Sequence, residues 1–234
     1  CANASKDVIY IAASSPAKSI YILPPSERLF SDVRELLLSP GCVLPSEPAE
    51  RKQNLFTTGA SEALYFCLNL ICNAGDQVII PEPFYANYNG FASAASVDVV
   101  PVISDFADQY ELPPIEKVIE KINSKTKAIL LCNPSNPTGY VYNKKEIEML
   151  GKLVIEKDIF LIVDEVYREF IHNGDPHYSV LCDSRWSEHS VMIDSVSKRY
   201  SMCGARVGCM VSRNKKLLKQ ALKYAQLRLS PPAY

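Results

Sequence analysis

The sequence lacks the features that mark several large classes of protein. Its 25 Lys and Arg residues are balanced by 26 Asp and Glu residues, so no basic surplus exists for neutralising nucleic-acid phosphates. The longest apolar runs, at 128–132 and 159–163, are far shorter than the roughly 20 residues that cross a bilayer. We therefore expect no nucleic-acid partner, no membrane helix and no membrane partner.

Metal-ligand and disulfide patterns are missing as well. The 8 cysteines are scattered, and none stands in a C-x-x-C pair or beside a histidine at ligand spacing. Most lie within apolar stretches, which is typical of buried thiols in a reducing compartment. The chain also has no charged and then apolar secretory leader. These absences predict a protein without a metal site, located in the cytoplasm.

The composition is that of a globular domain, and predicted strands and helices alternate along the chain. It has 234 residues, of which 47% are hydrophobic and 22% charged. Short β-branched runs predict buried strands, and stretches of helical periodicity lie between them. The alternation predicts an α/β fold with a mostly parallel sheet sandwiched by helices, whose ligands bind at the carboxyl ends of the strands. The expected strands are 78–80, 97–102, 128–131, 159–163, 191–194 and 207–211, and the expected helices are 62–72, 85–95, 115–121, 144–157 and 215–227.

The first 56 residues follow a different pattern. They are rich in Pro and Ser and contain one plausible helix, at 27–38, which a Ser-Pro-Gly sequence ends. We expect residues 1–56 to form an arm or part of a second lobe.

Lys198 is the first candidate for chemistry. It lies in a Ser-Val-Ser-Lys sequence directly after a predicted strand, with the hydroxyls of Ser195 and Ser197 beside it and Arg206 nearby. Partial burial and a neighbouring cation both favour the uncharged amine, which is the nucleophilic form. A plain surface lysine is the alternative. The S-x-x-K pattern of serine acyl-transfer enzymes also matches, but their S-D-N and K-T-G sequences are absent.

A second candidate is the start of the helix predicted near residue 62. Gly59, Ala60 and Ser61 lead into it, and backbone amides at a helix N-terminus form a site for one phosphate group. A structural helix start, capped by Ser or Thr with Glu62 nearby, fits the same residues equally well.

Two further candidates follow predicted strands. Asn136 lies in Asn-Pro-Ser-Asn-Pro-Thr-Gly, where two prolines impose a turn and its amide can donate and accept hydrogen bonds. Asp164 ends a five-residue apolar run, and a buried carboxylate needs a cation or hydrogen bonds. Asp164 is alternatively a helix cap or a metal ligand in a nucleotide site, but the G-x-x-x-x-G-K-[ST] loop of such sites is missing.

A phosphate cradle, a nucleophilic lysine and a buried carboxylate that needs a cation are together what pyridoxal phosphate requires. The motifs N-P-x-N-P-T-G, D-E-x-Y and S-x-S-K-x(5)-G-x-R-x-G complete the pattern. From about residue 55 to 211 the chain resembles the class I and II aminotransferases of the aspartate aminotransferase fold, which are fold type I pyridoxal-phosphate enzymes.

The resemblance implies a role for each matching residue. Lys198 forms the Schiff base with the cofactor and moves the proton, and Asp164 pairs with the pyridine nitrogen. Tyr167 and Asn136 bind the phenolic oxygen of the ring, and Tyr85 stacks on it. Lys198, Asp164 and Tyr167 are the expected catalytic residues. The phosphate site is expected to consist of Gly59, Ala60, Ser61, Ser195, Ser197 and Arg206.

The resemblance also predicts the activity, which is transfer of an amino group from an amino acid of aspartate type to a 2-oxo acid by a homodimer. Residues 57–230 match the large domain, and 231–234 would begin the connection to a C-terminal small domain that the chain lacks. That domain carries the arginine for the substrate carboxylate. A pyridoxal-phosphate lyase or decarboxylase, and an inactive cofactor-binding domain, are the alternatives.

Overall fold

The computed structural model describes residues 9–10, 21–22, 54–172 and 177–228. The helix expected at 27–38 and the connection expected at 231–234 lie outside these residues. Near the N-terminus, β1 (Ile9–Tyr10) and β2 (Tyr21–Ile22) pair as a short antiparallel ladder.

A seven-stranded sheet forms the centre of the described chain, in the order β3-β9-β8-β7-β6-β4-β5. Only β9 runs antiparallel to its neighbours in this sheet, because it returns between β3 and β8. The other neighbouring pairs are parallel, so the prediction of a mostly parallel sheet is confirmed. The strands are β3 (Asn54–Thr58), β4 (Gln77–Glu82), β5 (Asp98–Ile103), β6 (Thr126–Cys132), β7 (Phe160–Asp164), β8 (Ser190–Ser195) and β9 (Val207–Ser212).

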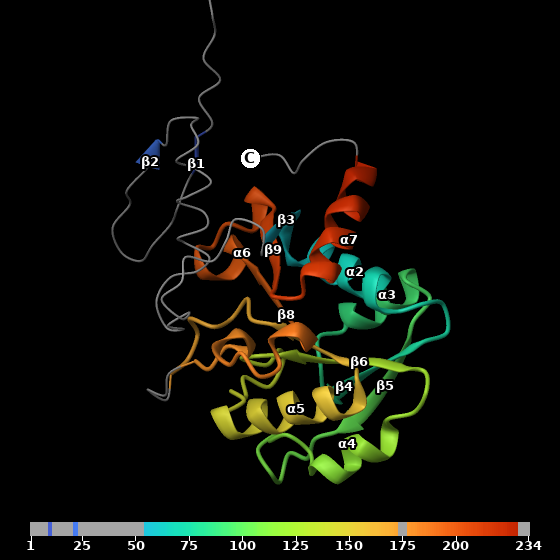
Figure 1. Ribbon diagram of the computed structural model, residues 1–234. Coiled ribbons are helices and arrows are strands. Elements are labelled where there is room, and N and C mark those ends of the chain that lie inside the picture. The colour runs from blue at the N-terminus through green and yellow to red at the C-terminus, as the bar shows by residue number, and fades with distance from the viewer. Residues whose placement is uncertain (1–8, 11–20, 23–53, 173–176, 229–234) are drawn as a thin grey trace, which may run out of the picture.

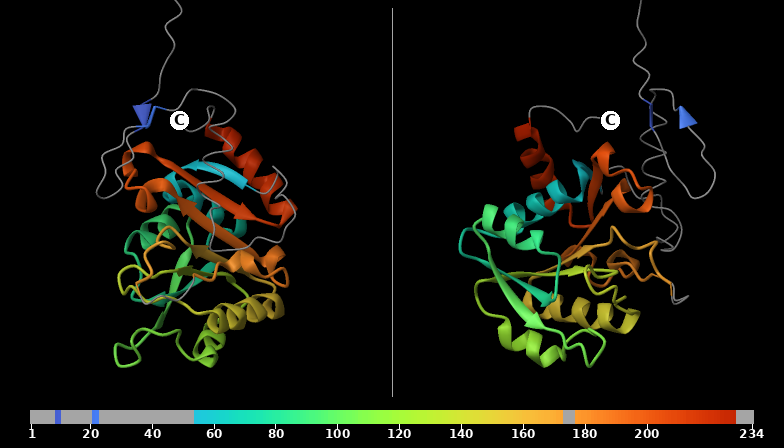
Figure 2. Two further views of the ribbon diagram at one scale, coloured as in Figure 1. Left: turned by 90° about the vertical axis from the view of Figure 1, so that its left-hand side faces the viewer. Right: turned by 180° about the vertical axis from the view of Figure 1, so that it is seen from behind.

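Helices cover both faces of this sheet, as Figures 1 and 2 show. On one face α4 (Ile115–Lys121) and α5 (Lys144–Lys157) pack over a core that includes Ile79 and Val163. The other face is covered by α2 (Gly59–Ile71), α3 (Asn87–Ala94) and α7 (Lys215–Ala225). Alternate residues of each strand point to opposite faces, so a strand that is apolar throughout supplies both cores.

Local sequence explains how α5 begins and how closely it packs. The Asn143 side chain accepts hydrogen bonds from the amides of Lys145 and Glu146, and the Glu146 side chain accepts one from the Asn143 amide, which forms a capping box. A Cβ atom on Gly151 would lie 2.4 Å from the indole ring of Trp186. The buried Trp186 therefore requires glycine at this position of the helix.

The structure differs from the sequence prediction in three places. β3 was not predicted, because it is a five-residue strand that alternates between buried and exposed residues beside the polar N-terminal segment. β5 is partly exposed and not buried on both faces, because it is the edge strand. Cys182 is disulfide-bonded, whereas free thiols were expected. The free cysteines among the described residues are Cys67, Cys72, Cys132, Cys203 and Cys209.

The order of the strands places a crevice at one edge of the sheet. The chain passes from β4 outward to β5 and then returns to the other side of β4 to form β6. At such a reversal the connections after neighbouring strands diverge, and a ligand site opens at their carboxyl ends. The described helices include none that is both long and apolar enough to cross a membrane.

Candidate functional site

A cavity of about 240 Å³ lies at the carboxyl ends of β6, β7 and β8, beside the start of α2. All the site residues expected from the sequence line it except Gly59, which directly precedes Ala60. The lining residues are Ala60, Ser61, Leu64, Tyr85, Tyr88, Phe91, Cys132, Asn136, Asp164, Val166, Tyr167, Ser195, Ser197, Lys198, Cys203 and Arg206. Segments that are more than 100 residues apart in the sequence thus form one site.

Asp164 is the last residue of β7 and is only 5% exposed. Its Oδ2 accepts a hydrogen bond from Tyr88 Oη at 3.0 Å, and its Oδ1 accepts one from the amide of Val166 at 3.3 Å. Burial raises the pKa of Asp164 to about 7, and these two hydrogen bonds oppose the rise. Among the described ion pairs, none involves Asp164. Its carboxylate is therefore suited to a cationic group of a ligand in the cavity.

Lys198 lies on α6 (Val196–Arg199), a single helical turn that follows β8. The Ser195 hydroxyl caps this turn by accepting a hydrogen bond from the Ser197 amide at 3.3 Å. The ammonium nitrogen of Lys198 lies 5.6 Å from the centre of the Tyr167 ring. The partial burial expected for this lysine is wrong, because its side chain is exposed where the cavity opens to solvent.

The start of α2 provides a place for an anion. The Thr58 side chain makes no capping hydrogen bond, although Glu62 accepts one from the Thr58 amide at 2.7 Å. The expected alternative, a complete capping box, is therefore only half formed. Arg206 approaches this helix start and donates to the carbonyl of Thr58 at 3.3 Å and to that of Cys203 at 3.0 Å. Free amides and a guanidinium together favour a phosphate group.

Two glycines allow these groups to come close together. Gly59 has φ +72°, and a Cβ atom there would lie 2.6 Å from an Arg206 nitrogen. A Cβ atom on Gly208 would lie 2.4 Å from the carbonyl carbon of Gly59. Side chains at these positions would fill the space in which Arg206 faces the amides of α2.

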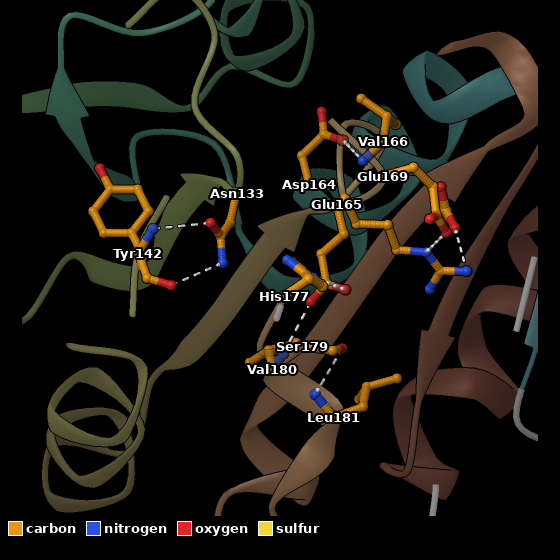
Figure 3. A network of polar contacts seen from close by, with 12 residues as sticks. Asn133, Tyr142, Asp164, Glu165, Val166, Glu169, His177, Ser179, Val180 and Leu181 are labelled. Carbon is orange, nitrogen blue, oxygen red and sulfur yellow. Dashed lines mark hydrogen bonds and ion pairs between the residues drawn. The ribbon is translucent and has the colours of Figure 1, made fainter. Parts of the chain in front are cut away.

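Asn136 and Tyr85 form the remaining predicted walls of the cavity. The Asn136 loop is anchored by Asn133, whose side chain accepts from the Tyr142 amide at 3.0 Å and donates to the Tyr142 carbonyl at 3.4 Å (Figure 3). Tyr85 is 37% exposed, and its ring meets that of Tyr88 edge to face at 5.5 Å. This contact fixes the orientation of an aromatic ring at the mouth of the cavity.

Sequence reasoning missed several residues of this site, of which Tyr88 and Cys132 bear on its chemistry. Tyr88 is 1% exposed and donates to Asp164. Burial raises the pKa of the Cys132 thiol to about 12, so it is a neutral group beside that carboxylate. No sequence signal pointed to Tyr88, because Tyr85 precedes α3 and the two tyrosines do not share a helix.

The groups around Asp164 suit an organic cation better than a metal ion. Its neighbour Glu165 points the other way, toward His177 and the amide of Val180 (Figure 3). Within residues 54–172 and 177–228, no group of three or more His, Cys, Asp or Glu side chains is arranged to hold a metal ion. The alternative of a metal–nucleotide site at Asp164 therefore has no supporting ligand among these residues.

The sequence profile of the aminotransferase class I and II family matches residues 44–233, which is most of the chain. The chain belongs to this family. A similar sequence is the aspartate aminotransferase of Bacillus subtilis (strain 168), with 36% identity over 157 residues that cover 67% of this chain and 40% of the relative. Another is the asparagine–oxo-acid transaminase of Streptococcus mutans serotype c, with 37% identity over 164 residues, 69% of this chain and 41% of the relative.

Solved structures of family members share the fold. A double mutant of the aspartate aminotransferase of Thermus thermophilus superposes with a TM-score of 0.72 at 29% identity and covers 77% of this chain and 46% of its own. An aromatic aminotransferase from Pyrococcus horikoshii OT3 gives the same TM-score at 27% identity, covering 77% and 48%. The chain thus spans less than half the length of the relatives that it matches.

The family depends on pyridoxal phosphate, and the cavity fits that cofactor. The buried Asp164 matches a protonated ring nitrogen, the cradle between α2 and Arg206 matches a phosphate, and Lys198 supplies a primary amine. The chain therefore carries the polar groups that the aldehyde, ring and phosphate of the cofactor require.

Proposed function

We propose that this chain forms the cofactor-binding domain of a pyridoxal-phosphate-dependent aminotransferase that moves the amino group of an aspartate-type amino acid to a 2-oxo acid. One observation carries the proposal: Lys198, Asp164 and Arg206, from three separate segments, line a single cavity. The names of the matching relatives, among them aspartate aminotransferases and an asparagine–oxo-acid transaminase, support both the activity and the substrate class.

The start of α2 and the segment after β8 would hold the phosphate. The amides of the first helical turn donate without competition from the Thr58 side chain, and Arg206 adds a charge on the opposite side. These groups would fix the cofactor at one end. The residues that we assign to this role are Gly59, Ala60, Ser61, Ser195, Ser197 and Arg206.

Asp164, Tyr167, Asn136 and Tyr85 would hold the ring. Bound pyridoxal phosphate supplies an aldehyde that condenses with amines and a ring that withdraws electrons from the substrate. The carboxylate of Asp164 would pair with the ring nitrogen and favour its protonated state. Tyr167 and Asn136 would donate to the ring oxygen, and Tyr85 would cover one ring face.

Lys198 is assigned the proton transfer. Its amine lies beside the Tyr167 ring on a turn that opens into the cavity. In the uncharged state the Lys198 Nζ atom would accept a proton from the α-carbon of the amino acid, as a general base. Proton transfer by Lys198 would require α6 to stay at a fixed distance from the residues that hold the cofactor ring.

The domain division is part of the proposal. Residues 57–230 would be the large domain, preceded by an arm at 1–56 and followed from 231 by the connection to a small domain that binds the substrate carboxylate. The fold of the described residues and the partial coverage of longer relatives support this division. Expression of the complete reading frame would test it by showing whether residues beyond 234 restore activity.

The protein would act as a cytoplasmic homodimer. The free thiols Cys67, Cys72, Cys132, Cys203 and Cys209 favour a reducing compartment, whereas the disulfide at Cys182 argues against it. Light scattering after size exclusion would test the dimer, and cell fractionation would test the location.

The activity is tested by incubating the product of the complete reading frame with pyridoxal phosphate, aspartate and a 2-oxo acid and measuring oxaloacetate. We expect oxaloacetate to exceed the amount of cofactor present only when the 2-oxo acid is added, and Lys198→Ala to abolish this turnover. Release of ammonia without a 2-oxo acid would identify a lyase instead. A visible cofactor band without any turnover would identify an inactive cofactor-binding domain.

A further inference from the structure

A second buried carboxylate lies beside the site but outside the cavity. Asp194 is fully buried and directly precedes Ser195, the cavity residue that ends β8. Successive residues of a strand point to opposite faces, so the Asp194 side chain lies behind the wall to which Ser195 contributes.

Two arginines surround this carboxylate. Oδ2 of Asp194 lies 2.5 Å from Nη2 of Arg199 and 3.3 Å from Nη2 of Arg168. The two side chains are only 4% and 8% exposed. Glu169 Oε1 lies 3.7 Å from Nε of Arg199 and 4.0 Å from Nε of Arg168. Asp194 is thus a buried carboxylate paired with two buried cations, and the half-exposed Glu169 lies at the edge of the cluster.

Each group that binds Asp194 is a neighbour of a cavity residue. Arg199 directly follows Lys198, and Arg168 directly follows Tyr167. The Asp194 Oδ1 atom also accepts a hydrogen bond from the amide of Ser195 at 2.7 Å. One carboxylate thus connects the backbone segments that carry the amine, the tyrosine and the cap of α6.

Because α6 is short, it depends on contacts such as the ion pair with Asp194 for its stability. The helix has only four residues, and a single helical turn is unstable by itself because its first hydrogen bonds do not offset the lost chain entropy. Its first turn is held by the Ser195 cap, and its last residue is held by the pair between Arg199 and Asp194. The place of Lys198 between these two anchors depends on both of them.

We propose that Asp194 is a positioning residue that, through Arg199 and Arg168, holds the Lys198 turn and the Tyr167 turn in a fixed relation across the cavity. The inference rests on the proposed function, because it concerns how the amine meets the cofactor. The cluster orients the amine from behind without touching the ligand.

The charge state of the cluster agrees with this role. Burial raises the pKa of Asp194 to about 6, and the charges of Arg168 and Arg199 oppose the rise. At neutral pH the carboxylate is therefore ionised and able to hold both guanidinium groups.

The test measures cofactor binding and not turnover. Pyridoxal phosphate is titrated into the full wild-type chain and its Asp194→Asn variant. The visible band of the lysine-bound cofactor gives the Kd, and the pH at which this band is half-changed gives a pH midpoint. Melting of the cofactor-free proteins selects a temperature at which the variant is folded. The matched control is Asp183→Asn, which removes the carboxylate of another Asp–Arg pair, 2.6 Å from Arg185 and outside the cavity.

We expect Asp194→Asn to raise the Kd by about tenfold and to shift the midpoint by about half a pH unit or more. Asp183→Asn should leave both unchanged. A folded Asp194→Asn variant with the wild-type Kd and midpoint would overturn the proposal.

A second variant decides the question if Asp194→Asn does not fold. Arg199→Lys keeps the charge but loses the planar grip of the guanidinium, so we expect a smaller change in the same direction. Unchanged Kd and midpoint in Arg199→Lys would then overturn the inference. A wild-type chain that gives no visible band with pyridoxal phosphate would contradict the proposed function instead, so the two failures are distinguishable.

Discussion

The ends of the neighbouring strands β7 and β8 carry two buried carboxylates in opposite circumstances. Asp194, on β8, is surrounded by Arg168 and Arg199 from this chain. Asp164, on β7, accepts hydrogen bonds from neutral donors, Tyr88 and the amide of Val166, and pairs with no cation among the residues that the structure describes. A buried charge is costly without a counter-charge, so the first site is complete and the second has a place for a cation. We infer from this difference that Asp194 stabilises the fold and that Asp164 binds a ligand.

The largest effect on stability is expected when the charge of Asp194 is removed. Asp194→Asn removes the buried carboxylate that pairs with Arg168 and Arg199, and we expect the free energy of unfolding to fall by about 3–5 kcal/mol. Chemical denaturation of the cofactor-free protein measures this loss. A loss no larger than that in Asp183→Asn, whose carboxylate belongs to a surface pair, would show that the cluster contributes little.

Removing the charge of Asp164 should lower the activity without destabilising the fold. In Asp164→Asn the ring nitrogen loses the carboxylate that keeps it protonated, so we expect turnover to fall by about 100- to 1,000-fold. Steady-state kinetics at saturating pyridoxal phosphate measure this effect. Turnover within a few fold of wild type would contradict the assignment of Asp164 to the ring nitrogen.

Asp164→Asn should also change how the stability of the fold depends on pH. The pKa of Asp164 is raised to about 7 in the folded chain, above its unfolded value, so the cofactor-free fold loses stability as the pH rises through the interval between these two values. Asp164→Asn removes this loss. At pH 8 we expect the variant to be more stable than wild type by roughly 2–4 kcal/mol, and at pH 4 nearly equal to it.

Urea denaturation of both cofactor-free proteins from pH 4 to 8 measures the difference. A constant difference across this range would show that Asp164 does not carry the raised pKa.

The smallest effect is expected at the hydroxyl that contacts Asp164. Tyr88→Phe removes the hydrogen bond to Oδ2 and leaves the ring contact with Tyr85, so we expect the affinity for pyridoxal phosphate to fall by about three- to tenfold. Tyr142→Phe is the matched control, because Tyr142 is also buried but does not line the cavity. Equal effects of the two substitutions on the Kd would argue against a role for the Tyr88 hydroxyl.

Much of the fold could be predicted from the sequence because its strands are strongly apolar. The run at 128–131 is buried on both faces, the run at 159–163 is buried except for the partly buried Phe160, and the helices at 115–121 and 144–157 have the predicted bounds. β3 could not be predicted, since its place depends on pairing with β9 about 150 residues later. Long-range partners of this kind leave no periodic signal in a short segment.

The site could be predicted only where a motif carried it. Lys198, Asp164 and Asn136 lie in recognisable sequences and line the cavity together. Tyr88 donates a hydrogen bond to Asp164, which lies 76 residues later in the sequence, and Arg168 forms an ion pair with Asp194 on another strand. These contacts depend on how the strands are ordered in space, which the spacing of residues along the chain does not contain.

The central claim is that the amine of Lys198 binds pyridoxal phosphate in the cavity that Asp164 and Arg206 complete. The most direct test is reduction of the cofactor-treated protein with borohydride, followed by peptide mapping by mass spectrometry. The account predicts one pyridoxyl group, on the peptide that contains Lys198, and none in Lys198→Ala. A modified lysine elsewhere, with Lys198 untouched, would contradict it.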